Sequence, residues 1–274
     1  MTTPTSPLPP ILLVPGYWLG AWAWDAVTHR LTELGYHAEA VTLPGLESAD
    51  SPRATVRFAD HVACVADRVG ALGGRVVLVA HSGSGAVACA VADRMPDALA
   101  RVVYVDSGPV AHGTVPRPDL PAEASELPFP GLDVLATQGA SPEGLTDADS
   151  ARFRALAVPH PAGACREPVL LHDPRRHAVP TTLVCCSMPS SVVILSALVS
   201  TLDQPLDLHR RTDGFALLAA RSTACETAIA CAPMFAPVTD LTDLTLVDLP
   251  TGHWPMLSRP YDLADLIATE ARRD

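Results

Sequence analysis

The stretch Val79-Ala80-His81-Ser82-Gly83-Ser84-Gly85 joins the β-branched run Arg75–Ala80 to the helical segment Gly83–Arg94. A short apolar run that ends at a turn signal is typical of a strand buried on both faces. Ser82 has a small residue, alanine or serine, two positions before it and two positions after it. A tight strand-to-helix turn that exposes a serine hydroxyl requires small residues at those positions. The stretch therefore predicts a strand–turn–helix unit with a candidate nucleophile at Ser82.

Two other interpretations of this stretch remain open from the sequence alone. In a shifted register Ser84 would be the exposed serine, with Ser82 and Ala86 as its small neighbours. Alternatively, a loop rich in glycine and serine at a helix N-terminus binds an anion through its backbone N–H groups. We favour Ser82 as the nucleophile, because it directly follows the strand and His81.

Outward from this unit, strands and helices alternate along the chain. The expected strands are Ile11–Val14, Ala38–Leu43, Arg75–Ala80, Arg101–Asp106, Thr181–Cys186 and Leu244–Asp248. The expected core helices are Trp22–Leu34, Thr55–Leu72, Gly83–Arg94 and Tyr261–Ala271. Such alternation predicts an α/β fold, with a mostly parallel sheet of about six strands and helices on both faces. Ligands bind beyond the carboxyl ends of such strands, so the chemistry should come from residues that directly follow strands.

The middle of the chain interrupts this alternation. Seven prolines lie between Pro109 and Pro142, and the segment has no clear periodicity. We therefore expect residues 109–179 to form a cap or lid inserted into a core made of residues 1–108 and 180–274. Helix candidates within the lid are Ser125–Leu127 with Gly131–Gln138, and Asp147–Leu156. The segment before the last strand is also long, and its excess near Leu195–Ala220 has no predicted role.

The composition excludes several classes of function. The 274 residues include 30 acidic side chains and 19 basic ones, all arginine, for a net charge of −11, and they include neither lysine nor asparagine. Without lysine there is no Schiff-base chemistry and no Walker A phosphate loop, and without asparagine there is no Cys-His-Asn triad. The negative charge argues against nucleic acids and anionic membrane surfaces as partners. A small-molecule substrate is the expected partner, and a homodimer is compatible with the sequence.

The cysteines and the apolar segments give further expectations. Seven cysteines show no CxxC or Cys/His spacing typical of zinc, so we expect no metal site and no disulfide framework; no cofactor is expected either. The N-terminus lacks a basic start and an apolar h-region, which favours a cytoplasmic location. The uncharged segment from His177 to Leu202 is long enough to span a bilayer, but Pro180, Pro189 and five serines interrupt it. A buried strand followed by a buried helix is the better interpretation.

Two further loops follow strands, one near each end of the chain. The first reads Val14-Pro15-Gly16-Tyr17-Trp18-Leu19-Gly20-Ala21-Trp22-Ala23-Trp24, and the second reads Leu249-Pro250-Thr251-Gly252-His253-Trp254-Pro255-Met256. Together with the serine turn, they resemble the α/β-hydrolase superfamily, and in particular its plant methylesterase and hydroxynitrile lyase branch with its bacterial esterase relatives. Members of that branch carry His-Gly-x-x-x-Gly-x-Trp-x-Trp in the first loop, where this chain has Pro15 in place of the histidine. The resemblance covers residues 11–108, 181–186 and 244–271.

The resemblance implies a role for each matched position. Ser82 would be the nucleophile and His253 the general base, because a serine hydroxyl is a weak nucleophile until an imidazole accepts its proton. The backbone N–H groups of Tyr17 and Gly83 would form an oxyanion hole, since a tetrahedral intermediate needs preorganised donors. Residues that flank these positions would line an apolar substrate pocket: Gly16, Trp18, Trp254 and Met256. The alternative for the tryptophans of the first loop is that they simply pack its helix.

The carboxylate that should orient His253 is missing from its usual place. In this branch it follows the fifth strand, but no Asp or Glu occurs between Asp173 and Asp203. Asp106, at the end of the fourth strand, is our candidate, because some α/β-hydrolases place their acid there. The alternative is that Asp106 only caps the following turn through Ser107 and Gly108. We expect Asp248 to be a strand-end or turn residue.

The type of reaction can be narrowed but not settled from the sequence. Hydroxynitrile lyases of this branch have threonine at the position of Gly16 and lysine directly after the catalytic histidine, where this chain has Trp254. Dehalogenases use an aspartate nucleophile, whereas the candidate here is Ser82. We therefore expect a serine hydrolase that cleaves a small apolar ester, thioester or lactone. The alternative is a non-hydrolytic protein of the same fold, such as a biosynthetic cyclase or lyase, or a ligand-binding accessory protein.

Overall fold

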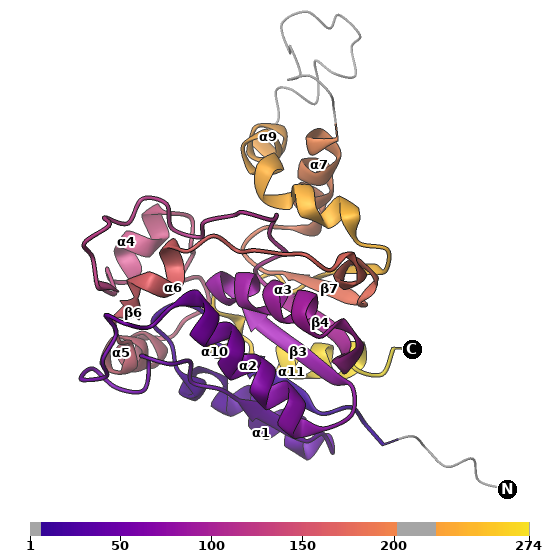
Figure 1. The fold of residues 1–274 in the computed structure, drawn as a ribbon, viewed down its shortest axis with the longest axis horizontal. Helices are drawn as coiled ribbons and strands as arrows, with labels where there is room; N and C mark the ends of the chain where they lie inside the picture. The colour runs from indigo at the N-terminus through magenta and orange to yellow at the C-terminus, as the bar shows by residue number, and fades with distance from the viewer. Residues whose placement is uncertain (1–6, 202–222, 274) are drawn as a thin grey trace, which may run out of the picture.

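A computed structural model describes residues 7–201 and 223–273 and places a six-stranded parallel sheet at the centre of the molecule (Figure 1). The strand order is β2-β1-β3-β4-β7-β8, and every neighbouring pair is parallel. The strands are β1 (Ile11–Val14), β2 (Ala38–Ala40), β3 (Val76–His81), β4 (Leu99–Val105), β7 (Thr181–Cys185) and β8 (Leu244–Asp248). The expected α/β class, with about six strands, is confirmed.

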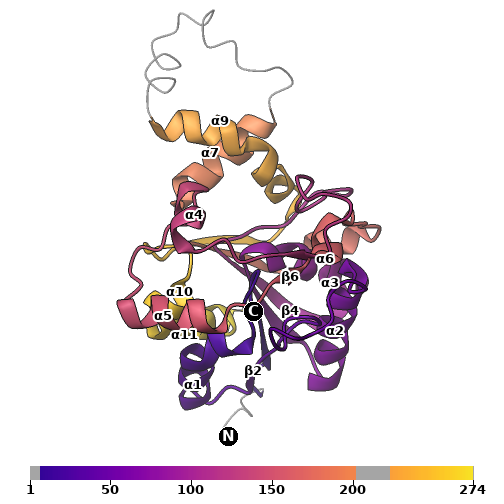
Figure 2. The same cartoon turned by 90° about the vertical axis from the view of Figure 1, so that its left-hand side faces the viewer.

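Helices cover both faces of this sheet. They are α1 (Asp25–Glu33), α2 (Phe58–Leu72), α3 (Gly85–Arg94), α10 (Pro255–Ser258) and α11 (Pro260–Glu270), with the 3₁₀ turns η1 (Ala21–Trp24), η2 (Ser82–Ser84) and η3 (Pro96–Ala98). Figure 2 shows α1 and α11 on one side of the strands and α2 and α3 on the other. Alternate strand residues enter separate cores: Leu12 and Val14 pack on the α2–α3 side, and Ile11 and Leu13 pack on the α1–α11 side.

Most expected elements differ by a few residues at their ends; the helix predicted from Thr55, for example, begins at Phe58. Two of these differences lie beside a contact between the first loop and the chain after β2. The predicted helix Trp22–Leu34 begins as the 3₁₀ turn η1 before α1, where the Thr42 hydroxyl accepts a hydrogen bond from the Ala21 N–H at 2.9 Å. The predicted strand Ala38–Leu43 is shortened to Ala38–Ala40; the N–H of Val41 still donates to Leu13 of β1, and the next residue is the Thr42 that contacts η1. Tertiary contacts, and not local propensity, therefore set these two boundaries.

The segment between β4 and β7 consists of short elements joined by irregular chain. These are β5 (Glu126–Leu127), α4 (Leu132–Thr137), α5 (Asp147–Leu156), β6 (His160–Pro161), α6 (Ala162–Arg166) and η4 (Pro174–Ala178). The helix predicted over Ser125–Leu127 is wrong, because Glu126–Leu127 instead pairs antiparallel with His160–Pro161. Pro128 follows directly, and the residue before a proline is disfavoured in helical geometry.

The chain between β7 and β8 forms a pair of helices that stands away from the sheet (Figure 1). These are α7 (Ser190–Ser200) and α9 (Thr223–Phe235), followed by η5 (Ala236–Asp240). The uncharged segment from His177 to Leu202 thus contains the expected strand and helix, β7 and α7. Among the described residues, no helix is long and apolar enough to cross a membrane. Most of the excess predicted near Leu195–Ala220 lies outside the described residues, from residue 202 onward.

Candidate active site

Ser82 lies in a strained turn between β3 and α3. Its φ of +52° is in the left-handed region, which non-glycine residues seldom occupy and which functional sites often retain. Ser84 is buried, and its hydroxyl donates to the carbonyl of Pro15 in the first loop. The shifted register is therefore disfavoured, because the hydroxyl of Ser84 is already committed to holding that loop.

Ser82, His253 and Asp106 form a continuous hydrogen-bonded chain although they come from three separate strand ends. The Nδ1 atom of His253 lies 2.6 Å from Oδ2 of Asp106, and its Nε2 atom lies 2.8 Å from Oγ of Ser82. A carboxylate can only accept, so the proton of the neutral imidazole is on Nδ1. Nε2 is then left as an acceptor for the serine hydroxyl.

Asp106 reaches His253 through an unusual backbone conformation and a dense set of donors. Its φ is +45°, in the left-handed region that non-glycine residues seldom adopt. Oδ1 accepts from the N–H groups of Cys186 (3.1 Å) and Ser187 (2.9 Å), and Oδ2 also accepts from the hydroxyl of Ser187 (2.6 Å). Burial raises the pKa of this carboxyl, but the hydrogen bonds from His253 and Ser187 outweigh burial and lower it. Asp106 is therefore held as a carboxylate.

Asp106 and Asp248, which both lie at strand ends, make different contacts. The carboxylate of Asp106 does not cap the turn at Ser107, whose hydroxyl instead donates to the carbonyl of Ser82 at 2.6 Å. Asp248, at the end of β8, accepts from the N–H and the hydroxyl of Ser190 at 2.7 and 2.6 Å. Asp248 thus anchors the start of α7, whereas Asp106 occupies the position beside the imidazole.

The first loop lies tightly against the serine turn. A Cβ atom added at Gly16 would lie 2.7 Å from Nδ1 of His81 and 3.0 Å from Cβ of Ser82, so only glycine permits this approach. The ring of Tyr17 fills the space that a Cβ atom at Gly83 would need. Gly16 and the ring of Tyr17 thus bring the first loop into contact with the turn that carries Ser82. This is where the two predicted oxyanion donors would have to lie.

The aromatic and sulfur side chains expected to line a pocket lie mostly inside the core. Trp18, Trp254 and Met256 are 7%, 2% and 1% exposed. The Trp254 ring packs against His253 and Phe153, with ring centres 5.1 and 5.3 Å away. In this conformation these side chains offer a substrate almost no surface. Trp254 supports His253 through this ring contact.

Several residues that the sequence did not point to hold His253 in place. Nε2 of His81 donates to the backbone carbonyl of His253 at 2.7 Å. From the segment between β4 and β7, the carbonyl of Ser141 accepts from the N–H of His253 (2.7 Å) and the carbonyl of Glu143 accepts from the N–H of Gly252 (3.0 Å). A Cβ atom at Gly252 would collide with both of those carbonyls. Only the adjacency of His81 to Ser82 was visible in the sequence as a signal.

His81 is itself buried between the two functional segments. Burial, together with the nearby charge of His253, lowers the pKa of His81 to about 3. The neutral ring carries its proton on Nε2, because that atom faces a carbonyl, and Nδ1 is buried without a partner. As for cation ligands, the described ranges 7–201 and 223–273 contain no group of three His, Cys, Asp or Glu side chains that could hold a metal ion.

Comparison with known proteins identifies the family. The model of the alpha/beta hydrolase family matches residues 11–266, and the chain belongs to that family. No curated protein matches the chain.

Solved structures share the fold at low sequence identity. An extracellular α/β-hydrolase from a Paenibacillus species superposes with a TM-score of 0.66 and 16% identity, over 97% of this chain and 100% of that one. A methylesterase from Arabidopsis gives 0.64 and 15%, over 96% and 98%. A pyrethroid hydrolase from Sphingobium faniae gives 0.62 and 20%, over 96% and 97%. At these identities the similarity establishes the fold, and these neighbours are hydrolases by name.

Proposed function

We propose that this member of the alpha/beta hydrolase family is a serine hydrolase that cleaves a small apolar ester, thioester or lactone through an acyl-enzyme at Ser82. The observation that carries the proposal is the chain of hydrogen bonds from Ser82 through His253 to Asp106, at 2.8 and 2.6 Å. These distances fall within the range expected of a nucleophile and its base. The hydrolase names of structures with the same fold support ester hydrolysis in general.

In the proposed mechanism each residue has one task. Nε2 of His253 accepts the proton of Ser82 as Oγ attacks the substrate carbonyl, and Asp106 stabilises the imidazolium that forms. The N–H groups of Tyr17 and Gly83 stabilise the developing oxyanion, a contribution of about 2.7–4 kcal/mol per donor in comparable enzymes. His253 then protonates the leaving group. A water molecule, activated by the same imidazole, releases the acyl group from Ser82.

The substrate class rests on the chemistry of the site. A serine nucleophile favours acyl transfer, whereas a cyanohydrin lyase of this type would need a lysine beside the histidine, and the chain has none. The half-buried aromatic ring of Tyr17 lies against Gly83, beside the nucleophile, and an aromatic wall at that place favours an apolar acyl or aryl group. We propose further that the protein acts in the cytoplasm on a small molecule, with no nucleic-acid or membrane partner. The six described cysteines are all free thiols, in keeping with a reducing compartment.

A fluorophosphonate probe tests the proposal directly. Stoichiometric labelling of the wild-type protein that is lost in Ser82→Ala, together with turnover of p-nitrophenyl butyrate, is the expected result. Ser84→Ala is the matched control, because it removes a hydroxyl two residues away that already donates to Pro15. This variant should still be labelled.

Other outcomes would redirect the proposal. Labelling lost in Ser84→Ala but retained in Ser82→Ala would assign the nucleophile to the shifted register. If the folded wild-type protein neither reacts with the probe nor turns over esters, the hydrolase proposal is wrong and the non-hydrolytic alternative is favoured. That alternative is a cyclase, a lyase or a ligand-binding protein that uses the same site.

A further inference from the structure

A cavity of about 490 Å³ lies on the α3 side of the sheet, away from the triad. Its walls come from α3, β4, η4, β7 and η5, and Cys89, Tyr104, Val110, Arg176, Thr181 and Leu241 are among the residues that line it. A volume of this size is within the range of small-molecule sites, roughly 300–1,000 Å³. We call it the β4 cavity, because Val102 and Tyr104 of that strand are among the residues that line it.

The β4 cavity is separate from the candidate active site. Its lining includes none of Ser82, His253 and Asp106. Cys89 lies seven residues beyond Ser82 along α3, which corresponds to about 10 Å of helix. Val102 lies four residues before Asp106 on β4, or about 13 Å of strand. The triad is at the carboxyl ends of the strands, whereas this cavity is lower on the face of the sheet.

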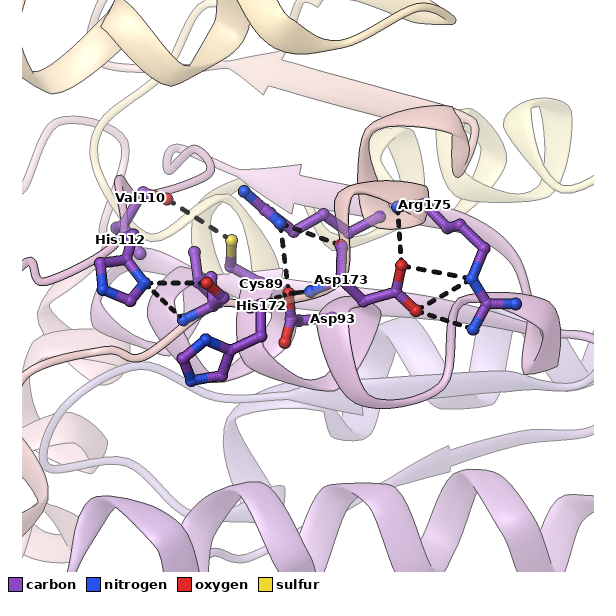
Figure 3. Close-up of polar contacts among 9 residues, drawn as sticks. Cys89, Asp93, Val110, His112, His172, Asp173 and Arg175 are labelled. Atoms are coloured by element: carbon purple, nitrogen blue, oxygen red, sulfur yellow. Dashed lines mark hydrogen bonds and ion pairs between the residues drawn. The ribbon is translucent and has the colours of Figure 1, made fainter.

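Arg176 supplies the positive charge of the β4 cavity and is fixed in place. Its side chain is 17% exposed, and Nη1 donates to Oδ1 of Asp93 (3.2 Å) and to the carbonyl of Asp173 (2.9 Å). The same Asp93 oxygen accepts from the N–H groups of His172 and Asp173, both at 2.8 Å (Figure 3). These contacts tie η4 to α3 and restrict the guanidinium before any ligand arrives.

The other edge of the guanidinium is unused. Nε and Nη2 of Arg176 have no hydrogen-bond partner among residues 7–201 and 223–273, although the side chain lines the cavity. Burial raises the pKa of both Tyr104 and Cys89, so the tyrosine hydroxyl and the cysteine thiol that line the cavity stay neutral. An arginine with two free donors in a partly enclosed, mostly neutral cavity is suited to a planar carboxylate.

Nearby charges limit the ligand to a single negative charge. Asp240 lines the cavity from η5 and is exposed, and Asp93 already neutralises much of Arg176. A phosphate or a dicarboxylate would bring a second charge close to these acids. The remaining walls combine apolar residues, Ala92, Val102 and Leu241 among them, with hydroxyl groups such as that of Thr181 and with two histidines, His112 and His177. We propose that the β4 cavity is a second ligand site, which binds a small monocarboxylic acid with an apolar body.

Binding of 4-phenylbutyrate, with 4-phenylbutanol as its uncharged counterpart, tests this proposal by isothermal titration calorimetry. We expect saturable binding of the acid, at least about tenfold weaker binding of the alcohol, and a loss of at least about tenfold in Arg176→Gln, because a charge-assisted pair is removed. Arg175→Gln is the matched control from the same 3₁₀ turn. The Arg175 side chain is 62% exposed and pairs outside the cavity with Asp97 and Asp173. This control should bind the acid normally.

A second variant tests whether the loss of binding in Arg176→Gln comes only from misfolding. Ala236→Trp adds a bulky ring to the cavity wall from η5 while Asp93 and Arg176 are both retained, and it should also abolish the binding event. If the acid also binds at the active site, the wild-type protein will show two binding events. Arg176→Gln and Ala236→Trp should then each remove the event that belongs to the β4 cavity and leave the other. Acid binding that is unchanged in both folded variants, or equal binding of the alcohol, would overturn the proposal. Absence of saturable binding to the wild-type protein would overturn it too. None of these outcomes depends on ester turnover, so they are independent of the function proposed for the triad.

Discussion

Replacing Asp106 by asparagine should remove the acceptor that orients His253 while leaving the surrounding loop in place. In the structure Oδ2 of Asp106 faces Nδ1 of His253 at 2.6 Å, and Oδ1 accepts from the N–H groups of Cys186 and Ser187. An asparagine oxygen can keep those two backbone contacts. Its amide nitrogen would then face Nδ1 as a donor and favour the tautomer with the proton on Nε2. That tautomer cannot accept the proton of Ser82.

The expected loss is large because the proton is on the wrong nitrogen. In a serine-protease triad the same change lowers kcat by about 10⁴, which corresponds to about 5.4 kcal/mol of barrier. Asp106 makes the same contact with Nδ1 of His253, so we expect a loss of a similar order in kcat. The loss of charge-assisted bonds from Ser187 and His253 should lower the free energy of unfolding by roughly 1.5–3 kcal/mol.

Turnover of p-nitrophenyl butyrate and thermal unfolding measure the two effects separately. Asp248→Asn is the matched control, because Asp248 also ends a strand and accepts from the N–H and hydroxyl of one serine, Ser190, but does not contact His253. The control should keep its turnover to within a few-fold. Near-normal kcat in a folded Asp106→Asn protein, or an equal loss in Asp248→Asn, would refute the assignment of Asp106.

Three further predictions concern the groups around the triad. Ser187→Ala removes one hydroxyl donor to Asp106 but leaves the backbone donors. We expect kcat for p-nitrophenyl butyrate to fall by about tenfold with KM unchanged. A change in KM alone would argue against a role of Ser187 in positioning Asp106. Gly83→Ala places a Cβ atom in the ring of Tyr17, so the loop must shift and kcat should fall by about 10²–10³, as for loss of one oxyanion donor, while thermal unfolding still shows a folded protein; unchanged kcat would mean that these two backbones do not bind the oxyanion. His81 is neutral in the folded protein down to about pH 3, whereas in the unfolded chain it binds a proton below about pH 6.5. Between those values the unfolded state holds more protons, so stability falls as the pH falls, and from pH 7.5 to 5 the loss due to His81 is about 2 kcal/mol. Urea unfolding at the two pH values should show a difference smaller by that amount in His81→Gln; an equal difference in both proteins would contradict the buried neutral histidine.

The local pattern of the sequence was sufficient for the class of fold and for two members of the candidate site. Alternation of apolar runs and amphipathic segments predicted the parallel sheet, because each kind of element has its own periodicity. Small residues around Ser82 predicted the sharp turn, and Gly252 before His253 marked the loop after the last strand. The helix predicted at Ser125–Leu127 failed, because a two-residue strand is defined by its partner at His160–Pro161 and not by its own sequence.

Other features of the site could be decided only by tertiary structure. No pattern near Asp106 shows that it faces a histidine 147 residues away; that depends on its positive φ and on donors from Ser187 across the sheet. Burial of Trp254 and Met256, which the sequence placed in a pocket, likewise depends on packing against other segments.

One physical cause separates the features that the local sequence predicts from those that depend on tertiary contacts. Strand, helix and turn preferences act over a few residues, so the sequence by itself determined the elements, their order and the serine turn. Contacts across the sheet join segments that are far apart in the chain, and these depend on register, on backbone angles at strand ends and on side-chain packing. The pairing of His253 with Asp106 and the Arg176-lined β4 cavity belong to this second kind. Only the folded chain brings their residues within a few ångströms.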